Sequence, residues 1–197
     1  MYIPPAFRIE DERIMFALMR SYDFALVMVP GEADPAATHI PLKLDDERRR
    51  LIGHVAMANP IADHIRAGRQ ALAVFTGPHA YVSPTWYGEP NENVPTWNYM
   101  AVHVEGQFVP LEGENAERSL SSQIADFESV WRITDIEVGK RARLEAAIQA
   151  FELEITSLKG KAKLSQNKSA EDRRRLAEAL MERGENALAH KMMEGVS

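Results

Sequence analysis

Aromatic rings and histidines gather in one stretch of the sequence, residues 73–106, which reads AVFTGPHAYVSPTWYGEPNENVPTWNYMAVHVEG. Large flat rings, those of Trp86, Trp97 and Tyr99, stand there near polar groups such as His103. Apolar flat surface with a few polar groups is typical of pockets for planar ligands. We therefore expect this stretch to hold a planar ligand, and His103 is the candidate proton donor if the site is catalytic.

Each of these residues also has a plainer interpretation. An aromatic side chain can equally pack in the core or in a subunit interface. The histidines on predicted strands lack the i, i+4 spacing of a helical zinc pair, so we expect no metal site. The chain has no cysteine, which excludes thiolate chemistry, and any redox reaction must therefore use a bound cofactor.

Two segments carry residues suited to binding an anion such as a phosphate. In GHVAMANP, His54 and Asn59 lie at a predicted strand end and a predicted helix start, where free backbone N–H groups attract anions. In KAKLSQN, Lys163 and Ser165 lie two residues apart, which would place them on one side of an extended strand. The alternative for His54 is a half-buried histidine that is already hydrogen-bonded.

Hydrogen-bonding groups for the edge of a planar ring occur in two places. Thr38 and His39, in ATHIP, offer backbone and side-chain groups. Gln166 and Asn167 carry both donors and acceptors. These two residues can equally cap the helix that we expect to begin near Ser169.

Hydrophobic periodicity predicts the elements that position these residues. Before residue 112 we expect two helices, 11–22 and 61–67, and strands over 24–29, 38–44, 51–56, 71–76, 80–83 and 98–109. The strands 38–44 and 51–56 should pair antiparallel across a charged turn. Short strands with one helix among them favour a small barrel, because parallel crossovers need longer helices.

After residue 113 the hydrophobic period becomes helical. We expect helices over 116–130, 141–155 and 170–194, with a break at Gly184 and a turn at 159–161. This pattern predicts an α+β protein with a helical C-terminal third. The barrel core with its N-terminal helix would span 1–112, and the helical part, 113–197, would pack on it within a single domain.

The motifs ATHIPL, GHVAMANP and GKAKLSQN occur along the chain together with the aromatic stretch and the opening MYIPPAF. In these motifs and their order, the chain closely resembles the PaiB-type family of FMN-binding negative transcriptional regulators. The resemblance covers nearly the whole chain. It implies a split β-barrel like that of pyridoxamine phosphate oxidase-like flavoproteins, a homodimer with its pocket along the subunit interface, and FMN as cofactor. Many split-barrel flavoproteins carry arginine or lysine where this chain has His54 or Met57.

The resemblance and the candidate residues together imply an FMN site. Its ligands would be Thr38, His39, His54, Asn59, Trp86, Trp97, Tyr99, Lys163, Ser165, Gln166 and Asn167. Three functions compete: a flavin-binding regulator with possible FMN-dependent oxidoreductase activity, a regulator that binds DNA directly, and a dimeric interaction protein without cofactor.

Charge limits the partners of this chain. The net charge is −6, yet residues 140–175 carry ten basic and five acidic residues, which are either solvated helix faces or an anion site. We expect DNA contact to be weak, because the best recognition-helix candidate, 169–185, mixes arginines with glutamates. Without a signal peptide or a run of about 18 apolar residues, the chain should be cytoplasmic and make no membrane contact.

Overall fold

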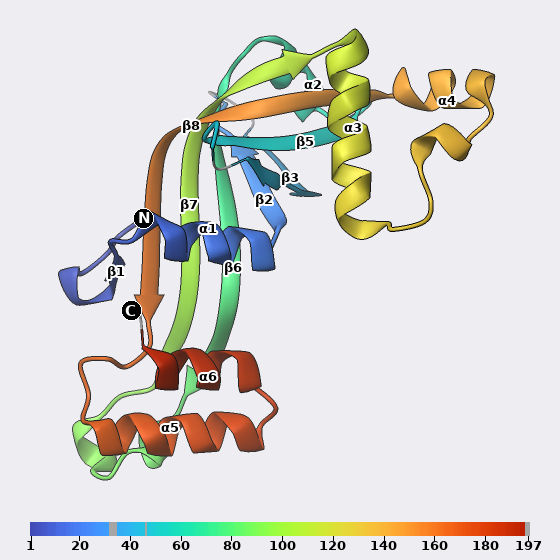
Figure 1. Cartoon of the computed structure of the whole chain (residues 1–197). Helices are drawn as coiled ribbons and strands as arrows, with labels where there is room; N and C mark the ends of the chain where they lie inside the picture. Colours follow the sequence, from blue (N-terminus) through green and yellow to red (C-terminus); the bar gives the residue numbers. More distant parts are fainter. Residues whose placement is uncertain (32–34, 46, 196–197) are drawn as a thin grey trace. The chain divides into compact units, whose positions relative to one another are not determined.

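The computed structural model describes residues 1–31, 35–45 and 47–195. They fall into two compact units. Unit 1 contains 1–22, 75–103 and the part from 159 onward, and unit 2 contains 23–74 and 104–158. Three long strands contribute to both units: β6 (Gln70–Val82), β7 (Thr96–Leu111) and β8 (Ile148–Lys163) (Figure 1).

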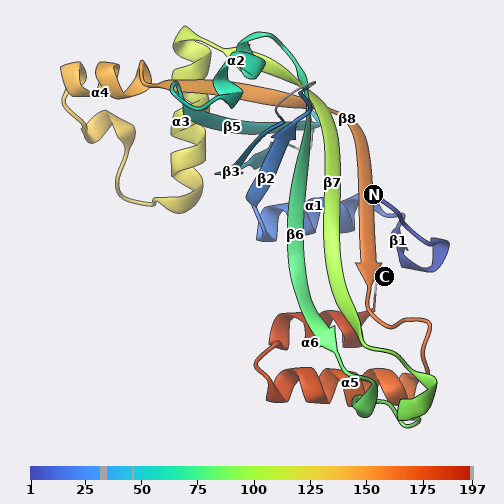
Figure 2. The ribbon, with the colours of Figure 1, turned by 180° about the vertical axis from the view of Figure 1, so that it is seen from behind.

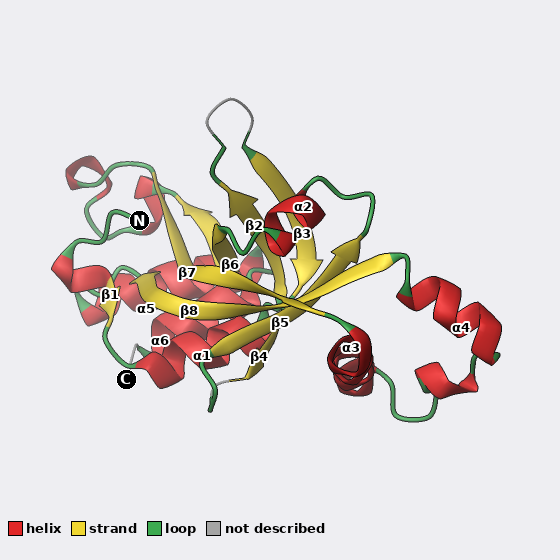
Figure 3. Cartoon of the chain, turned by 90° about the horizontal axis from the view of Figure 1, so that it is seen from above, coloured by secondary structure: helices red, strands yellow, loops and turns green. Residues whose placement is uncertain are grey.

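In the described part of the chain, eight strands form one sheet, drawn in yellow in Figure 3. The strand order is β3-β2-β6-β7-β8-β5-β4, and β1 (Arg8–Ile9) pairs with β8. The pairings β1–β8, β2–β3, β2–β6, β4–β5 and β5–β8 are antiparallel. The predicted α+β class is confirmed.

Within its described residues, unit 2 contains four short strands, and apolar residues of β2 and β5 such as Val27 and Leu51 are buried in its core. The four strands are β2 (Phe24–Val29), β3 (Ala36–Pro41), β4 (Lys43–Asp45) and β5 (Arg50–Ala56). Its helices are α2 (Ile61–Arg66), α3 (Gly113–Phe127) and α4 (Val138–Glu145), with a 3-10 turn at Ile133–Asp135. Helix α3 lies against β5. In the core, Phe108 and Phe151 pack edge to face, with ring centroids 5.0 Å apart.

Among its described residues, unit 1 contains three helices, two of which begin at a side chain that caps the helix N-terminus. The three helices are α1 (Glu12–Ser21), α5 (Ala170–Glu182) and α6 (Asn186–Glu194), with 3-10 turns at Pro5–Phe7, Pro84–Trp86 and Pro90–Glu92. The Asp11 carboxylate caps α1 by accepting from the Arg13 backbone N–H, and the Ser169 hydroxyl caps α5. Helices α5 and α6 pack side by side (Figure 2).

Helix α1 covers one face of the three long strands, in front of them in Figure 1 and behind them in Figure 2. Two glycines allow this close approach. A Cβ atom at Gly160 would lie 2.6 Å from Met15 Sδ, and one at Gly77 would lie 2.9 Å from a Leu18 methyl carbon. The odd-numbered residues of β7 and the end of β8 therefore point to the opposite face.

Several predicted elements are confirmed. The helix 11–22, the strand 24–29, the helix 61–67 and the helical pair broken at Gly184 are found within a few residues of the expected bounds. Predicted strand 98–109 is the centre of β7. Among the described helices, none has both the length and the apolar composition that crossing a membrane requires.

The predicted helix 141–155 and the predicted turn 159–161 are wrong. Helix α4 ends at Glu145, and from Ile148 the chain runs as strand β8 through Gly160 to Lys163. Residues 149–153 are all buried, so this part of the strand does not show the alternation that marks a half-buried strand. Pairing with β5 determines the structure here.

Two further strand predictions are wrong in their boundaries. Segments 71–76 and 80–83 form the single strand β6, in which the alternation of buried residues shifts by one at Pro78 and His79, as in a β-bulge. Strand 38–44 is divided into β3 and β4, and β3 pairs with β2 rather than with the 51–56 strand. The compact units also follow other boundaries than the predicted division at residue 112, and a single domain remains a prediction.

Candidate functional site

The face of the unit 1 strands opposite helix α1 carries a group of aromatic and cationic side chains, some exposed and some buried. We call it the aromatic–lysine face, and it consists of His79, Tyr81, Trp97, Tyr99, Lys161 and Lys163. The Trp97 ring lies 6.3 Å from both the His79 and the Tyr81 rings. Trp97 is 54% exposed and Tyr81 is 42% exposed. This face therefore offers flat apolar surface to solvent or to a ligand.

Two lysines lie beside these rings. Lys161 is buried, and its Nζ atom lies 5.0 Å from the Tyr99 ring centroid and 5.8 Å from that of Tyr2. It donates a hydrogen bond to the Tyr2 carbonyl at 3.2 Å. Lys163 donates to Thr96 Oγ1 and, at 2.9 Å, to the Trp97 carbonyl. Burial, and then the charge of Lys161, lower the pKa of Lys163.

Ser165 does not extend the strand past Lys163, so the prediction that both lie on one side of a strand is wrong. Strand β8 ends at Lys163, and Ser165 has a φ of 57°, which belongs to the left-handed region. Its side chain is buried, and its hydroxyl accepts a hydrogen bond from Asn98 Nδ2 at 2.9 Å. Ser165 thus has an internal partner.

Gln166 stabilises the turn after β8. Its Oε1 accepts from the Leu164 backbone N–H at 2.7 Å, and its Nε2 donates to the Ala162 carbonyl and to the Ala6 carbonyl at 3.0 Å. Asn167 is exposed. Ser169 is the residue that caps α5, so the alternative role of Gln166 and Asn167 as caps is excluded.

Trp86 joins the aromatic–lysine face to helix α5. Its ring lies 6.4 Å from that of Tyr81, and the Arg183 guanidinium lies 5.3 Å from its centroid. The Gly88 backbone N–H donates to Asp172 Oδ1 at 3.0 Å and is the main cause of a lowered Asp172 pKa. The loop with Trp86 is therefore held against α5.

Thr38, His39 and Asn59 lie in unit 2. Asn59 Nδ2 donates to Thr38 Oγ1 at 3.1 Å, and Asn59 Oδ1 accepts from the first backbone N–H of α2 at 3.0 Å. The exposed His39 ring stacks on Phe24, with centroids 5.9 Å apart and planes 24° apart. Phe24 is itself exposed. These residues present a second flat surface near a polar pair.

His54 lies under helix α3. Its Nδ1 atom is 3.2 Å from Oε1 of the buried Gln123, so Nδ1 carries the hydrogen of this bond. The half-buried, hydrogen-bonded histidine that the sequence left open as an alternative is thus present. Sequence reasoning missed Arg66, whose Nη1 donates to Met57 Sδ at 2.9 Å and whose Nη2 is paired with the Asp63 carboxylate.

The predicted site residues are divided between the two units. Thr38, His39, His54 and Asn59 lie in unit 2, and the others lie in unit 1. His103 lies on β7, half-buried, on the strand side that also carries Tyr99. Lys161 was missed, because the predicted turn at 159–161 placed it outside a strand, whereas β8 runs through it to Lys163. Groups of three or more metal-ligating side chains do not occur within the described ranges.

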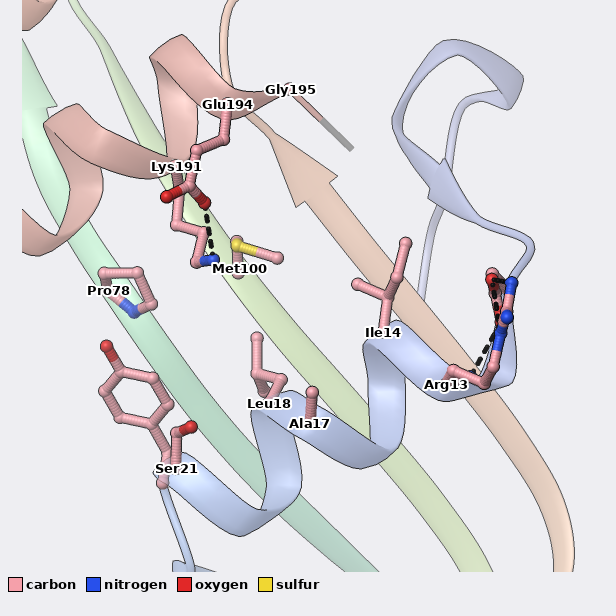
Figure 4. Close-up of a pocket in the computed structure, with 12 residues that line it drawn as sticks. Arg13, Ile14, Ala17, Leu18, Ser21, Pro78, Met100, Lys191, Glu194 and Gly195 are labelled. Atoms are coloured by element: carbon pink, nitrogen blue, oxygen red, sulfur yellow. Dashed lines mark hydrogen bonds and ion pairs between the residues drawn. The ribbon is translucent and has the colours of Figure 1, made fainter. Parts of the chain in front are cut away.

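Unit 1 also contains a groove of about 510 Å³ between α1, β6, β7 and the end of α6 (Figure 4). Its floor is apolar and includes Leu18, Pro78 and Met100. The charges at its rim are paired with each other, as in the ion pair of Lys191 with Glu194 at 2.8 Å. None of the predicted site residues lines it, and its neutralised rim is unsuited to a phosphate.

Comparison with known proteins gives a family and a fold. Residues 1–157 match the family described as "Putative FMN-binding domain". The Bacillus subtilis (strain 168) "Protease synthase and sporulation protein PAI 2" is 32% identical over 203 residues, which cover 98% of this chain and 95% of that protein.

Solved structures resemble the chain at lower identity. The FAD and heme binding protein from Mycobacterium smegmatis has a TM-score of 0.61 and 15% identity, over 84% of this chain and 78% of its own. The flavocytochrome Anf3 from Azotobacter vinelandii has a TM-score of 0.61 and 14% identity, over 84% and 74%. The predicted split-barrel class is confirmed.

Proposed function

The chain belongs to the PaiB-type family, whose FMN-binding domain it carries over residues 1–157, and from this premise we propose that it is an FMN-binding negative regulator of transcription. The observation that carries the proposal is this match together with the relative that is 32% identical along nearly the whole chain. The cofactor of the family is a flavin, and FMN supplies hydride and single-electron transfer when it is bound.

The residues of the structure suit such a cofactor. FMN needs flat surface for its ring system, an anion site for its phosphate and hydrogen-bonding groups for the ring edge. Trp97 and Tyr99 supply exposed or half-buried rings, and Lys163 supplies positive charge. Thr38 and His39 offer polar groups in unit 2. We keep His103 as the proposed proton donor of an FMN-dependent reaction.

We propose further that the protein works as a homodimer. Exposed aromatic side chains on the aromatic–lysine face, above all Trp97 at 54%, leave apolar surface that a second copy would cover. A pocket along the interface of two copies would also shield the flavin ring from water.

Direct reading of DNA has less support than flavin binding. On α5, Arg174 faces Glu178 at 3.9 Å and Arg175 faces Glu171 at 2.7 Å, so both arginines are paired within their own helix. Such a surface supports only weak contact with phosphates that falls as salt rises. We propose that regulation acts indirectly, in the cytoplasm, through the flavin or a protein partner.

Titration of FMN fluorescence with the purified protein tests the cofactor. We expect quenching with a Kd of about 1 μM or lower, which corresponds to roughly 8 kcal/mol, because ring and phosphate are both bound. Visible absorption of the purified protein provides an independent check. Unchanged FMN fluorescence at high protein concentration would remove flavin from the proposed function and favour a cofactor-free dimer.

A further inference from the structure

We propose that Lys161 and Lys163 together form a phosphate-binding site, and that the site takes a phosphate monoester whose flat ring lies on the neighbouring Tyr99 and Trp97 rings. The ligand class rests on the proposed function, since FMN has both groups. The two-lysine anion site stands on the contacts of unit 1 alone. It adds Lys161 to the residues that the sequence indicated.

Geometry places both ammonium groups on one face. Residues two apart on a strand point to the same side, and both lysines lie in the last three residues of β8. Lys161 contacts Tyr99 of β7 through its Nζ atom at 5.0 Å, and Lys163 reaches the Trp97 carbonyl of the same strand. The two charges therefore meet over the same part of β7.

Charge then indicates what the site binds. The hydrogen bonds of these ammonium groups go to neutral oxygens, those of Tyr2, Thr96 and Trp97. Two like charges that are partly removed from water and face neutral partners repel each other. A phosphate dianion would accept charge-assisted hydrogen bonds from both and relieve the repulsion.

The surroundings decide which phosphate compounds fit. Tyr99 lies directly beside Lys161, and Trp97 is exposed next to His79 and Tyr81. A flat ring attached to the phosphate finds stacking surface at this distance. FMN and 5′-nucleotides share this chemistry, so the experiment has to separate them.

Lys161→Met, Lys163→Met and the double variant test the proposal, with Lys191→Met as a control of equal charge change at the rim of the groove. Each protein is titrated with FMN, riboflavin and AMP by calorimetry. Thermal unfolding is followed with inorganic phosphate and with sodium chloride at matched ionic strength. We expect each lysine variant to weaken FMN binding about 10- to 100-fold and to leave riboflavin binding within about twofold.

The outcomes separate the site from the function. Loss of phosphate protection in the double variant, with protection kept in Lys191→Met, supports the anion site even if the wild type binds no flavin. Tight FMN binding that is equal in all variants overturns the site and leaves the proposed function in place. Tighter binding of AMP than of FMN supports the site and contradicts flavin as its ligand. Unfolding temperatures without ligand show whether each variant folds.

Discussion

At the scale of single residues, Asn98 and Ser165 form a polar pair that is fully enclosed by protein. Asn98 Nδ2 donates to Ser165 Oγ at 2.9 Å, and both side chains are buried. Ser165 adopts its positive φ where β8 ends, so the pair holds the turn after Lys163 to strand β7. The orientation of Lys163 thus depends on the hydrogen bond between Asn98 and Ser165, two residues that would not themselves contact a ligand.

Asn98→Ala should lower the free energy of unfolding by about 1–3 kcal/mol, because the Ser165 hydroxyl would stay buried without its partner. Urea unfolding measures this loss. Asn167→Ala, at an exposed position nearby, is the matched control and should change stability by less than about 0.5 kcal/mol. Equal stability of the two variants would show that the buried pair contributes nothing.

At the scale of elements, the contact between α1 and β8 depends on a glycine, Gly160, which has no side chain. A Cβ atom at Gly160 would lie 2.6 Å from Met15 Sδ and 3.0 Å from Ile9 Cβ. The helix covers one face of the strand, and the lysines next to Gly160 must then point to the other. Packing of α1 is therefore what orients Lys161 and Lys163.

Gly160→Ala should destabilise the protein by about 1–3 kcal/mol, since the added methyl group overpacks this contact. Met15→Ala removes the nearest atoms, so the double variant should lose less stability than the sum of the single losses. Gly88→Ala serves as control, because its nearest neighbour would lie 3.6 Å away. If the stability losses of the two single variants, measured by denaturant unfolding, add up in full in the double variant, the proposed clash between the added methyl group and Met15 is contradicted.

At the scale of the whole molecule, the exposed rings of the aromatic–lysine face are the main reason to expect a dimer. Trp97 and Tyr81 expose 54% and 42% of their surface. Isolated exposed apolar residues are ordinary, but neighbouring aromatic rings that contact each other are typical of interfaces and ligand sites.

Light scattering should therefore give twice the chain mass of 22.1 kDa at micromolar concentration. Trp97→Glu should shift the equilibrium toward the single chain, because it places a charge in the proposed interface. Trp131→Glu, at a tryptophan that is 43% exposed in unit 2, should leave the mass unchanged. A wild-type mass of a single chain would contradict the dimer.

Local signals in the sequence were sufficient for several elements and for the family. Asp11 caps α1, and Gly184, with a φ of 83°, separates α5 from α6. Such features act on backbone groups within a few residues of themselves, and the motifs around Thr38, His54 and Lys163 could likewise be identified without a structure.

Only the tertiary structure decided the course of residues 148–163 and the site that depends on it. A buried strand is determined by its neighbours, here β5 and β1, and its own residues do not alternate where both faces are covered. The predicted turn at 159–161 hid the common face of Lys161 and Lys163, because β8 in fact continues through it. The pair exists because hydrogen bonds between segments distant in sequence, together with the packing of α1, determine which side of β8 each residue faces.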